Sequence, residues 1–524
     1  MDRERVALFG ASGTMGWKAF EELWRRRERY DIVLLLRPSA KNKAMFAPYE
    51  RMAGVASTDG PGIVRGQGLT IVWGDATRYE DVVEAVQGVD YVLDAMAYIS
   101  PQADYHPEIA CAVNTEGIRN IIGAIESQPG GAEHICLAYT GTVAATGDRL
   151  PPIHWGRVGD PLKPSIFDYY AVTKIAGERL VLESAIKHWV SLRMTFIMPT
   201  CYQDCLDLQD PIAFHMPINA CMENITDRDA GFGLVNVLDV GRDSDFWRRV
   251  YNMGGGPQMR CTAYDFLNLN YMLNGLSGVE ACTERCWYAL RNFHMQFYQD
   301  SQVLERYLHF WRDSLQSYWQ AVAQSMPLSM RAVAWLCRHA PAVRKQVEAV
   351  TYRRMQAMVE NHRNGTVYWY QHRNDRRISA FFKDYVTYEA ILGWEQDLPA
   401  VDPTQPCSPL DHGYDERKAH LDVSDLQQAA RFRGGECLAK TWNGGRYSPL
   451  TWRCAYGHEF EARPYTVLKA GHWCPQCTPP PWDYDRQARS NPFFAQVWYP
   501  NHDADEQNCY PADCTLDIAN ADQD

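Results

Sequence analysis

Tyr170 and Lys174 are the residues of this sequence whose types and spacing most directly indicate proton-transfer chemistry. A separation of four places both side chains on one face of a helix. The lysine ammonium can then lower the pKa of the tyrosine phenol, which is about 10 in water, so that the phenol acts as a general acid or base closer to neutral pH. Tyr169 adjoins the pair but lacks this spacing, so Tyr170 is the predicted proton-transfer residue.

A second group of chemically active residues lies near the C-terminus, where Cys454 and His458 are followed by Cys474 and Cys477. Two close pairs of ligands, separated by a stretch long enough for a hairpin and a turn, suit a tetrahedral Zn²⁺ ion. Four nitrogen and sulfur ligands leave no position for a substrate. The predicted zinc is therefore structural, and it would bind as this unit folds.

The first sixteen residues, MDRERVALFGASGTMG, lead from a short apolar strand into a glycine-rich turn. Gly10 permits the tight exit from the strand, Gly13 lets the backbone approach a pyrophosphate, and Gly16 lets the following helix pack closely. Free N–H groups at the start of that helix face the phosphates. The turn predicts a dinucleotide site, and together with Tyr170 and Lys174 it indicates a nicotinamide-dependent enzyme.

The residues after the second predicted strand indicate which dinucleotide binds. A carboxylate there binds the 2′-hydroxyl of the adenosine ribose, whereas a basic residue accommodates a 2′-phosphate. This chain has Arg37, followed by Lys41 and Lys43. We therefore expect NADP in preference to NAD. The alternative interpretation is that these residues only form a solvated basic loop.

Alternating helical and apolar β segments must position these residues. The predicted strands are apolar throughout, which is typical of a parallel sheet covered by helices on both faces. We expect an α/β fold: a Rossmann doubly wound parallel sheet with a helical insert and a small C-terminal zinc-binding domain. The predicted strands are 6–9, 32–36, 69–73, 91–95, 135–138 and 192–197, and the predicted helices are 15–27, 81–86 and 114–125.

Several segments of the first half resemble the extended short-chain dehydrogenase/reductases, also described as the NAD-dependent epimerase/dehydratase family. They follow the family's order from Arg5 to the mid-260s, at 10–16, 74–75, 95–97, 114–117, 170–174, 237–240 and 251–256. The resemblance implies that Asp75 contacts the adenine and that Lys174 holds the nicotinamide ribose. The cofactor-binding residues that it implies are Gly10, Ser12, Gly13, Thr14, Met15, Gly16, Arg37, Asp75, Ala97, Tyr170, Lys174 and Pro199.

The resemblance also implies a catalytic hydroxyl three residues before a valine, which selects Thr140, with Thr142 as the alternative. Such a hydroxyl would hydrogen-bond the substrate oxygen where charge develops. The acidic pair of sugar dehydratases is replaced by Gly141 and Thr142, and the family's tyrosine is missing from 143–147. The expected NAD(P)-dependent reaction therefore interconverts a carbonyl and a secondary alcohol. A nucleotide-sugar epimerase/dehydratase, or a non-catalytic dinucleotide-binding scaffold or sensor, is the alternative.

Residues 271–400 change in character, because aromatic and apolar residues recur at helical spacing between Leu304 and Tyr318. As a lid, this region would shape a pocket for a small apolar or aromatic substrate; otherwise it is a packing layer or an oligomer interface. The expected domains are a Rossmann domain with substrate-binding elements (1–270), a helical aromatic-rich region (271–400), a zinc domain (401–480) and an acidic tail (481–524).

The segments 434–438, 452–454, 457–460 and 471–477 resemble a treble-clef or zinc-ribbon domain, with Cys437 and His472 as substitute ligands. Such domains often bind nucleic acid. Here Glu436, Glu459 and Glu461 dilute the positive charge, so a folding clip or subunit contact is expected instead. The end of the tail, 503–524, is acid-rich and is expected to be loosely ordered.

The composition limits the classes of function. A chain of 524 residues suggests several domains, and its net charge of −12 disfavours nucleic acid as a partner. No apolar run approaches the roughly 20 residues of a membrane-spanning helix, and no signal peptide is visible. We therefore expect a cytoplasmic enzyme of a small-molecule substrate, with no membrane partner and with reduced cysteines. Homo-oligomerisation stays open.

Overall fold

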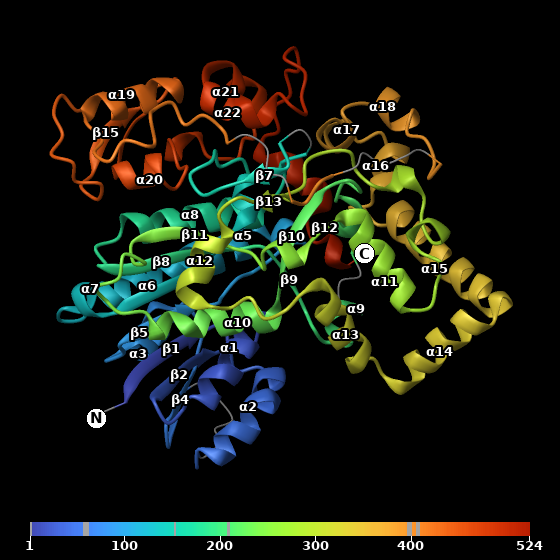
Figure 1. The fold of residues 1–524 in the computed structure, drawn as a ribbon, viewed down its shortest axis with the longest axis horizontal. Coiled ribbons are helices and arrows are strands. Elements are labelled where there is room, and N and C mark those ends of the chain that lie inside the picture. Colours follow the sequence, from blue (N-terminus) through green and yellow to red (C-terminus); the bar gives the residue numbers. More distant parts are fainter. Residues whose placement is uncertain are drawn as a thin grey trace.

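The computed structural model describes residues 3–55, 62–150, 153–206, 210–395, 401–404 and 409–523. Its central strands are β1 (Glu4–Phe9), β2 (Tyr30–Leu36), β3 (Gly62–Gly66), β4 (Leu69–Trp73), β5 (Tyr91–Asp94), β6 (Cys136–Thr142), β8 (His188–Met194) and β11 (Arg249–Met253). They form one sheet in the order β11-β8-β6-β5-β1-β2-β4-β3 (Figure 1). All neighbours are parallel except β3 and β4, at the edge. This is the doubly wound Rossmann sheet that the sequence predicts.

Helices cover both faces of this sheet. On one face, α1 (Thr14–Arg25), α10 (Asp227–Asn236) and α12 (Ser301–Leu308) pack against Val6 and Leu8 of β1. On the other face, α3 (Tyr79–Val86), α6 (Gly117–Glu126) and α8 (Tyr169–Glu183) pack in the cluster that contains Ala7 and Phe9. Successive strand residues point to opposite faces, so one apolar run supplies both cores.

Two predicted strands differ from the observed ones. The strand predicted at 135–138 continues as β6 to Thr142, because it pairs in parallel with β8 as far as the pair Thr142 and Met194. The strand predicted at 192–197 is divided between the end of β8 and β9 (Phe196–Met198). β9 joins β10 (Cys221–Thr226) and β12 (Arg260–Thr262) in a separate three-stranded sheet.

The aromatic region folds into several helices. The stripe predicted from Leu304 to Tyr318 is interrupted, because α12 ends at Leu308 and His309 adopts a positive φ of 47°. The carboxylate of Glu305 then accepts the backbone N–H groups of Phe310 and Trp311, which holds the chain outside the helix. The helices around this point are α11 (Ala263–Leu273), α13 (Leu315–Ser325), α14 (Leu328–His339), α15 (Pro341–Asn361), α16 (Thr366–Gln371), α17 (Asp375–Phe382) and α18 (Tyr385–Glu389).

The C-terminal part of the chain lies along the side of the sheet that carries α8 (Figure 1). It contains the antiparallel strands β14 (Glu436–Cys437), β15 (Leu450–Arg453) and β16 (Glu459–Ala462). Its helices are α19 (Val423–Phe432), α20 (Pro464–Leu468), α21 (Tyr484–Ser490) and α22 (Pro492–Trp498). In the described part of the chain, no helix combines the length and the apolar character that crossing a membrane requires.

The prediction of a loosely ordered tail is wrong for the described residues. Tyr510 and Ile518 are buried, and Asp517 accepts two hydrogen bonds from Arg377 of α17, at 3.0 and 2.8 Å. Figure 1 shows the last residues, in red, returning to the centre of the molecule. The acid-rich composition of the tail did not reveal the few apolar residues that pack into cores formed by other parts of the chain. One of the acids, Asp517, pairs with the buried Arg377.

Shorter elements connect these parts. They are α2 (Ala40–Met52), α4 (Gln102–Tyr105), α5 (Pro107–Ala110), α7 (Gly131–His134), α9 (Tyr202–Leu206), β7 (Trp155–Gly156) and β13 (Phe297–Tyr298).

Candidate functional site

The glycine turn after β1 has a backbone shape that larger residues would disturb. Gly10 has a φ of 76°, and a Cβ atom there would lie 2.6 Å from the carbonyl oxygen of Ala95. A Cβ atom at Gly16 would lie 2.0 Å from the carbonyl oxygen of Gly10, so glycine permits α1 to pack on the strand. Gly13 and Thr14 are exposed, and no side chain caps α1. The N-terminus of α1 is therefore open to an anion.

The other predicted cofactor residues of the sheet follow the carboxyl ends of its strands. Arg37 follows β2, Asp75 follows β4 and Ala97 follows β5, and Arg37 and Ala97 are exposed. Together with the turn after β1, they border the edge where the strand order reverses, which is where ligands of open α/β sheets bind.

Not every predicted cofactor residue offers its side chain at this edge. The Met15 side chain is buried in the core, so only its backbone is available to a ligand. Asp75 Oδ1 already accepts hydrogen bonds from the backbone and hydroxyl of Thr77, both at 2.9 Å. Pro199 is buried after β9, where its carbonyl oxygen accepts a hydrogen bond from Cys205. Within the basic loop after β2, the Lys43 ammonium lies over the Trp73 ring.

Replacing Gly13 with alanine should separate cofactor binding from folding. A Cβ atom at Gly13 would meet only the Gly10 carbonyl oxygen, at 3.4 Å, and the backbone φ of −83° suits alanine. We expect unchanged thermal stability and binding of NADPH or NADH weakened about tenfold or more, because the methyl group keeps the pyrophosphate from the backbone. Nicotinamide fluorescence measures the affinity. Gly241→Ala, at an open position, is the control, and equal weakening in both variants would contradict the assignment.

Tyr170 lies in the first turn of α8, facing the carboxyl end of β6. Burial raises the pKa of Tyr170 to about 12, although a side-chain hydrogen bond with Thr142 lowers it and the nearby Asp168 carboxylate raises it further. The sequence predicts that Lys174 lowers the pKa of Tyr170, but in the structure this pKa is raised. A lysine at this position cannot offset the loss of water around the phenol.

The structure places Thr142, and not Thr140, beside Tyr170. Thr142 is the last residue of β6, whereas the sequence placed the strand end four residues earlier. Tyr139 packs in the core beneath α8 and Ala138 packs in the core of the opposite face. The Thr142 hydroxyl also accepts the backbone N–H of Ala144, at 3.1 Å, which fixes its position.

Lys174 is a buried cation without a hydrogen-bond partner in the described part of the chain. Its Nζ atom lies 4.2 Å from the centre of the Tyr139 ring. Burial lowers the pKa of Lys174 to about 8, while the carboxylates of Asp94 and Glu178 raise it. A buried ammonium normally has partners, so a ligand hydroxyl at this point would satisfy Lys174.

Asp94, at the end of β5, is a buried acid that the sequence analysis did not single out. Its Oδ1 atom accepts the backbone N–H of Met96 at 3.0 Å, which fixes the loop after β5. Burial raises the pKa of Asp94 to about 6, and the Lys174 ammonium opposes this rise. The sequence signal was an aspartate near the end of an apolar run, which was assigned only to the predicted strand 91–95.

Replacing Asp94 with asparagine should move the alkaline limit of activity. Removing an anion near Lys174 disfavours the ammonium, so the pKa of Lys174 should fall below about 8 and less of the residue should be protonated at pH 8. We expect the alkaline limb of kcat/KM to shift to lower pH. Asp90→Asn, at the exposed start of the same strand, is the control. An unshifted profile would contradict this role of Asp94.

Asn114 joins the loop after β5 to the helix that carries Tyr170. Its amide exchanges two hydrogen bonds with the backbone of Tyr98, at 2.7 and 2.9 Å. The same amide donates to the Thr173 hydroxyl at 3.0 Å. Asn114 lies in a π-helical segment (Cys111–Glu116), a distortion that is frequent at functional sites. These hydrogen bonds hold the loop after β5 against α8, and this loop borders the site.

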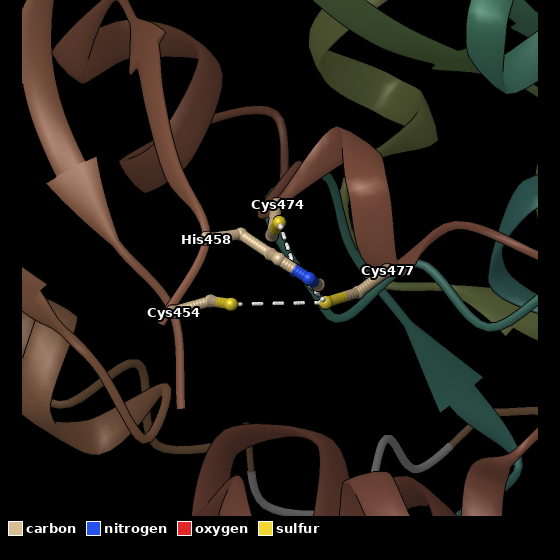
Figure 2. A group of neighbouring side chains, drawn as sticks. All are labelled: Cys454, His458, Cys474 and Cys477. Atoms are coloured by element: carbon tan, nitrogen blue, oxygen red, sulfur yellow. Dashed lines mark hydrogen bonds between the residues drawn. The ribbon is translucent and has the colours of Figure 1, made fainter. Parts of the chain in front are cut away.

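The four predicted metal ligands lie together in the C-terminal part (Figure 2). The sulfur atoms of Cys454 and Cys477 are 3.8 Å apart, and His458 Nδ1 lies 3.7 Å from the sulfur of Cys474 and 3.4 Å from that of Cys477. Tetrahedral ligands at zinc–ligand distances of about 2.0–2.3 Å are roughly 3.4–3.8 Å apart. The donor set and its spacing fit a tetrahedral metal ion.

The two alternative ligands have other partners. Cys437 is buried in the core of this unit, outside the group of four. His472 Nε2 lies 2.9 Å from Glu178 Oε2, and Arg193 donates to the same carboxylate at 3.0 and 2.7 Å. Glu178 lies one helical turn beyond Lys174. The metal-binding unit is thereby attached to α8, which the sequence analysis did not foresee.

A second cluster of the described residues, Asp485, His502 and Glu506, could also hold a cation by its spacing. Arg291 already donates to both carboxylate oxygens of Glu506, at 3.0 and 2.9 Å. Asp485 accepts the indole N–H of Trp498 at 2.7 Å. These partners account for the cluster as a buried ion-pair network.

Comparisons with known proteins found one family model and several solved structures. Residues 6–201 match the model of the NAD dependent epimerase/dehydratase family. A dTDP-glucose 4,6-dehydratase from Bacillus anthracis, in complex with NAD, is 13% identical, with 62% of this chain and 96% of that chain covered and a TM-score of 0.46. A double mutant of a dTDP-glucose 4,6-dehydratase from Streptomyces venezuelae is 16% identical, with coverages of 61% and 96% and a TM-score of 0.47. The search of curated proteins found no match.

Proposed function

We propose, from the premise that residues 6–201 belong to the NAD dependent epimerase/dehydratase family, that this enzyme moves hydride to and from a secondary carbinol of a nucleotide sugar. The observation that carries the proposal is the pair formed by Tyr170 and Thr142 beside the unpartnered Lys174, at the carboxyl edge of the sheet. This replaces the apolar substrate that the aromatic region suggested, since buried residues of that region, among them Trp369 and Phe381, pack in a core.

The roles of the three residues follow from their positions. In the oxidation direction, the Tyr170 phenolate accepts the proton of the substrate hydroxyl, and Thr142 donates a hydrogen bond to the same substrate oxygen. The bound nicotinamide would supply the hydride acceptor. Lys174 would hold the nicotinamide ribose. In the reverse direction Tyr170 returns the proton to the carbonyl oxygen.

The dinucleotide would bind along Gly10–Gly16, Arg37, Asp75 and Ala97. The open N-terminus of α1 supports the placement of its pyrophosphate there. The exposed Arg37 supports NADP in preference to NAD, because a guanidinium can bind a 2′-phosphate in bidentate fashion.

Epimerisation is favoured over loss of water by the residues that follow Thr142. Val143 and Ala144 are buried and apolar, so the acid and base that elimination needs are missing next to the catalytic hydroxyl. When Thr142 is taken as the catalytic hydroxyl, Val143 and Ala144 occupy the two positions after it where sugar dehydratases carry their acidic pair. In an epimerisation, the only side chains required at the reacting carbon would be Tyr170 and Thr142, which move and hold the proton, and Lys174, which would hold the cofactor that supplies the hydride chemistry.

We propose that the Cys454, His458, Cys474 and Cys477 group binds one structural Zn²⁺ ion. Three thiolates and one imidazole are typical of closed zinc sites, which have no position for substrate. We also propose the division of the chain into the Rossmann part (1–270), the helical part (271–400), the zinc unit (401–480) and a C-terminal segment (481–524). The hydrogen bonds from the zinc unit to α8 support a structural role for the metal.

Incubation with dTDP-glucose and UDP-glucose tests the proposed reaction. We expect inversion at one sugar carbon, seen by NMR, with no net change in absorbance of NAD(P)H, and no inversion by Tyr170→Phe. Stoichiometric accumulation of NAD(P)H would support a dehydrogenase of the same site instead. Formation of a 4-keto-6-deoxy sugar would contradict the epimerase assignment.

A further inference from the structure

Most of the surface of helix α14 is exposed to solvent. Of its 12 residues only Ala334 and Cys337 are buried, and Cys337 packs in a core with Leu276 and Cys282. The helix lies at the margin of the molecule, at the lower right of Figure 1 and away from the central sheet. One face of α14 therefore holds it to the protein, and the opposite face meets solvent.

Large apolar side chains lie on the exposed face of α14. Leu328 is 82% exposed, Trp335 is 56% exposed and Leu336 is 44% exposed. Together with the exposed Ala332 they follow the spacing i, i+4, i+7 and i+8, which forms one stripe along a helix. No other helix in the described part of the chain exposes more than two large apolar side chains. Such a surface marks a contact with another protein or with a membrane.

The charge around this stripe is positive, although the protein is acidic. Residues 314–347 contain no aspartate or glutamate, whereas the whole chain carries a net charge of −12. The basic residues of the same segment are Arg331, Arg338, Arg344 and Lys345. The segment therefore gives the molecule a local positive region next to the exposed apolar stripe, and such a region attracts an anionic surface.

Two of these arginines border the stripe directly. Arg331 and Arg338 lie seven residues apart, about two helical turns, so they project from the same side of α14. Arg331 donates hydrogen bonds to the carbonyl oxygens of Gln324 and Met326, and Arg338 donates to that of Leu273 at 2.7 Å. Carbonyl oxygens carry no net charge, so these bonds fix the arginines without neutralising them.

A bilayer with anionic lipids matches both features. Helices that lie in a membrane interface combine tryptophan and leucine on one face with arginine or lysine at its border. A second copy of this chain matches less well, because a two-fold contact through this face would bring the arginines of both copies together. The expectation of no membrane partner rested on the lack of a spanning helix, and binding at a membrane surface does not need one.

We propose that α14 docks this protein on a membrane surface that carries anionic lipids. Leu328, Trp335 and Leu336 enter the boundary between headgroups and acyl chains, and Arg331 and Arg338 contact the anionic headgroups. This inference goes beyond the proposed reaction and does not depend on it, because α14 contributes no residue to the candidate catalytic group.

Flotation of the purified protein with lipid vesicles tests this surface. Vesicles of phosphatidylcholine alone are compared with vesicles that also contain phosphatidylserine. We expect flotation with the anionic vesicles only, and we expect it to weaken as the salt concentration rises, because salt screens the attraction between arginine and headgroup. Flotation with neither kind of vesicle, or equal flotation with both, would overturn the proposal.

Leu328→Ser should weaken binding to the anionic vesicles about tenfold, because it removes a large apolar side chain from the stripe. Leu516→Ser is the matched control, since Leu516 is also largely exposed, at 69%, but lies between Asp513 and Asp517 in sequence. This variant should bind as the wild type does. Equal binding by the two variants would contradict the role of the stripe.

Arg338 separates the effect of charge from that of packing. Arg338→Gln should weaken binding to the anionic vesicles about fivefold, whereas Arg338→Lys, which keeps the charge, should bind nearly as the wild type does. Equal losses in both variants would contradict the role of the charge. Self-association of the wild-type chain that Leu328→Ser abolishes, without binding to vesicles, would overturn the proposal in favour of a contact between copies.

Discussion

Tyr170→Phe should lower the rate of hydride transfer about 10³-fold while leaving the dissociation constant of NAD(P)H unchanged. Phenylalanine retains the ring that packs at the start of α8 but has no proton to exchange with the substrate oxygen. The hydrogen bonds that hold the start of α8 are made by Asp168 and Thr173 rather than by the Tyr170 hydroxyl, so its removal should leave the fold intact. Single-turnover formation of NAD(P)H on the enzyme measures the step, and nicotinamide fluorescence measures the binding.

Thr142 and Thr140 provide a matched pair for the same experiment. Thr142→Val should reduce the rate about 10²-fold, because it removes a donor aimed at the developing charge. Thr140→Val removes a buried hydroxyl two residues earlier in the same strand, and because Thr142 is the threonine beside Tyr170, this change should affect the rate little. Full activity of Tyr170→Phe, or a larger loss in Thr140→Val than in Thr142→Val, would contradict the proposed catalytic group.

Removal of the metal should produce the largest loss of stability. Zn²⁺ contributes roughly 10–16 kcal/mol to the folding of zinc-finger peptides, and the unit that carries Cys454 and Cys474 has only a small core of its own. We expect purified protein to contain about one equivalent of zinc, and we expect Cys474→Ser to lose the zinc and to unfold at a markedly lower temperature. Metal analysis and thermal unfolding followed by circular dichroism measure both effects.

Cys437→Ser is the control for the metal, because Cys437 is a buried thiol of the same unit outside the group of four. This variant should keep its zinc and lose only the modest stability of one buried side chain. Because Arg179 of α8 donates a hydrogen bond to the Trp473 carbonyl oxygen at 2.7 Å, we expect loss of the metal to weaken NAD(P)H binding as well. Wild-type protein that is free of metal and insensitive to chelators would contradict the zinc assignment.

The sheet could be predicted from the sequence because its strands are short apolar runs between helices. Leu69–Trp73 is observed as predicted, and β1, β2 and β5 differ from their predictions by one or two residues at their ends. These strands are buried on both faces, so burial alone dictates an unbroken apolar pattern. The glycine turn was predictable for a similar reason, because Gly10 and Gly16 occupy positions where a Cβ atom collides with backbone.

The hydroxyl beside Tyr170 could not be selected from the sequence because the length of β6 depends on its neighbour. The run from Tyr139 to Thr142 contains glycine and threonine and looks like a turn. Parallel pairing with β8 nevertheless extends the strand through it. One such extension moves the end of the strand, and with it the residue that meets Tyr170, from the region of Thr140 to Thr142.

A small cavity at the start of α8 and the attachment of the zinc unit were also out of reach, since both depend on contacts between distant segments. Asp168 and Asn364 lie nearly 200 residues apart in sequence and line one space. Glu178 and His472 form a buried contact between α8 and the metal-binding unit. Each residue alone resembles an ordinary polar residue of a helix or a loop, and only the tertiary packing brings the pairs together.

Titration of the wild-type protein with NADPH and with NADH shows whether the glycine turn binds a dinucleotide. We expect saturable binding of one dinucleotide per chain, with enhanced nicotinamide fluorescence and tighter binding of NADPH than of NADH because of Arg37. Tighter binding of NADH would refute the role of Arg37 but leave the dinucleotide site in place. Binding of neither dinucleotide would contradict the account, because Tyr170, Thr142 and Lys174 would then have no hydride acceptor beside them.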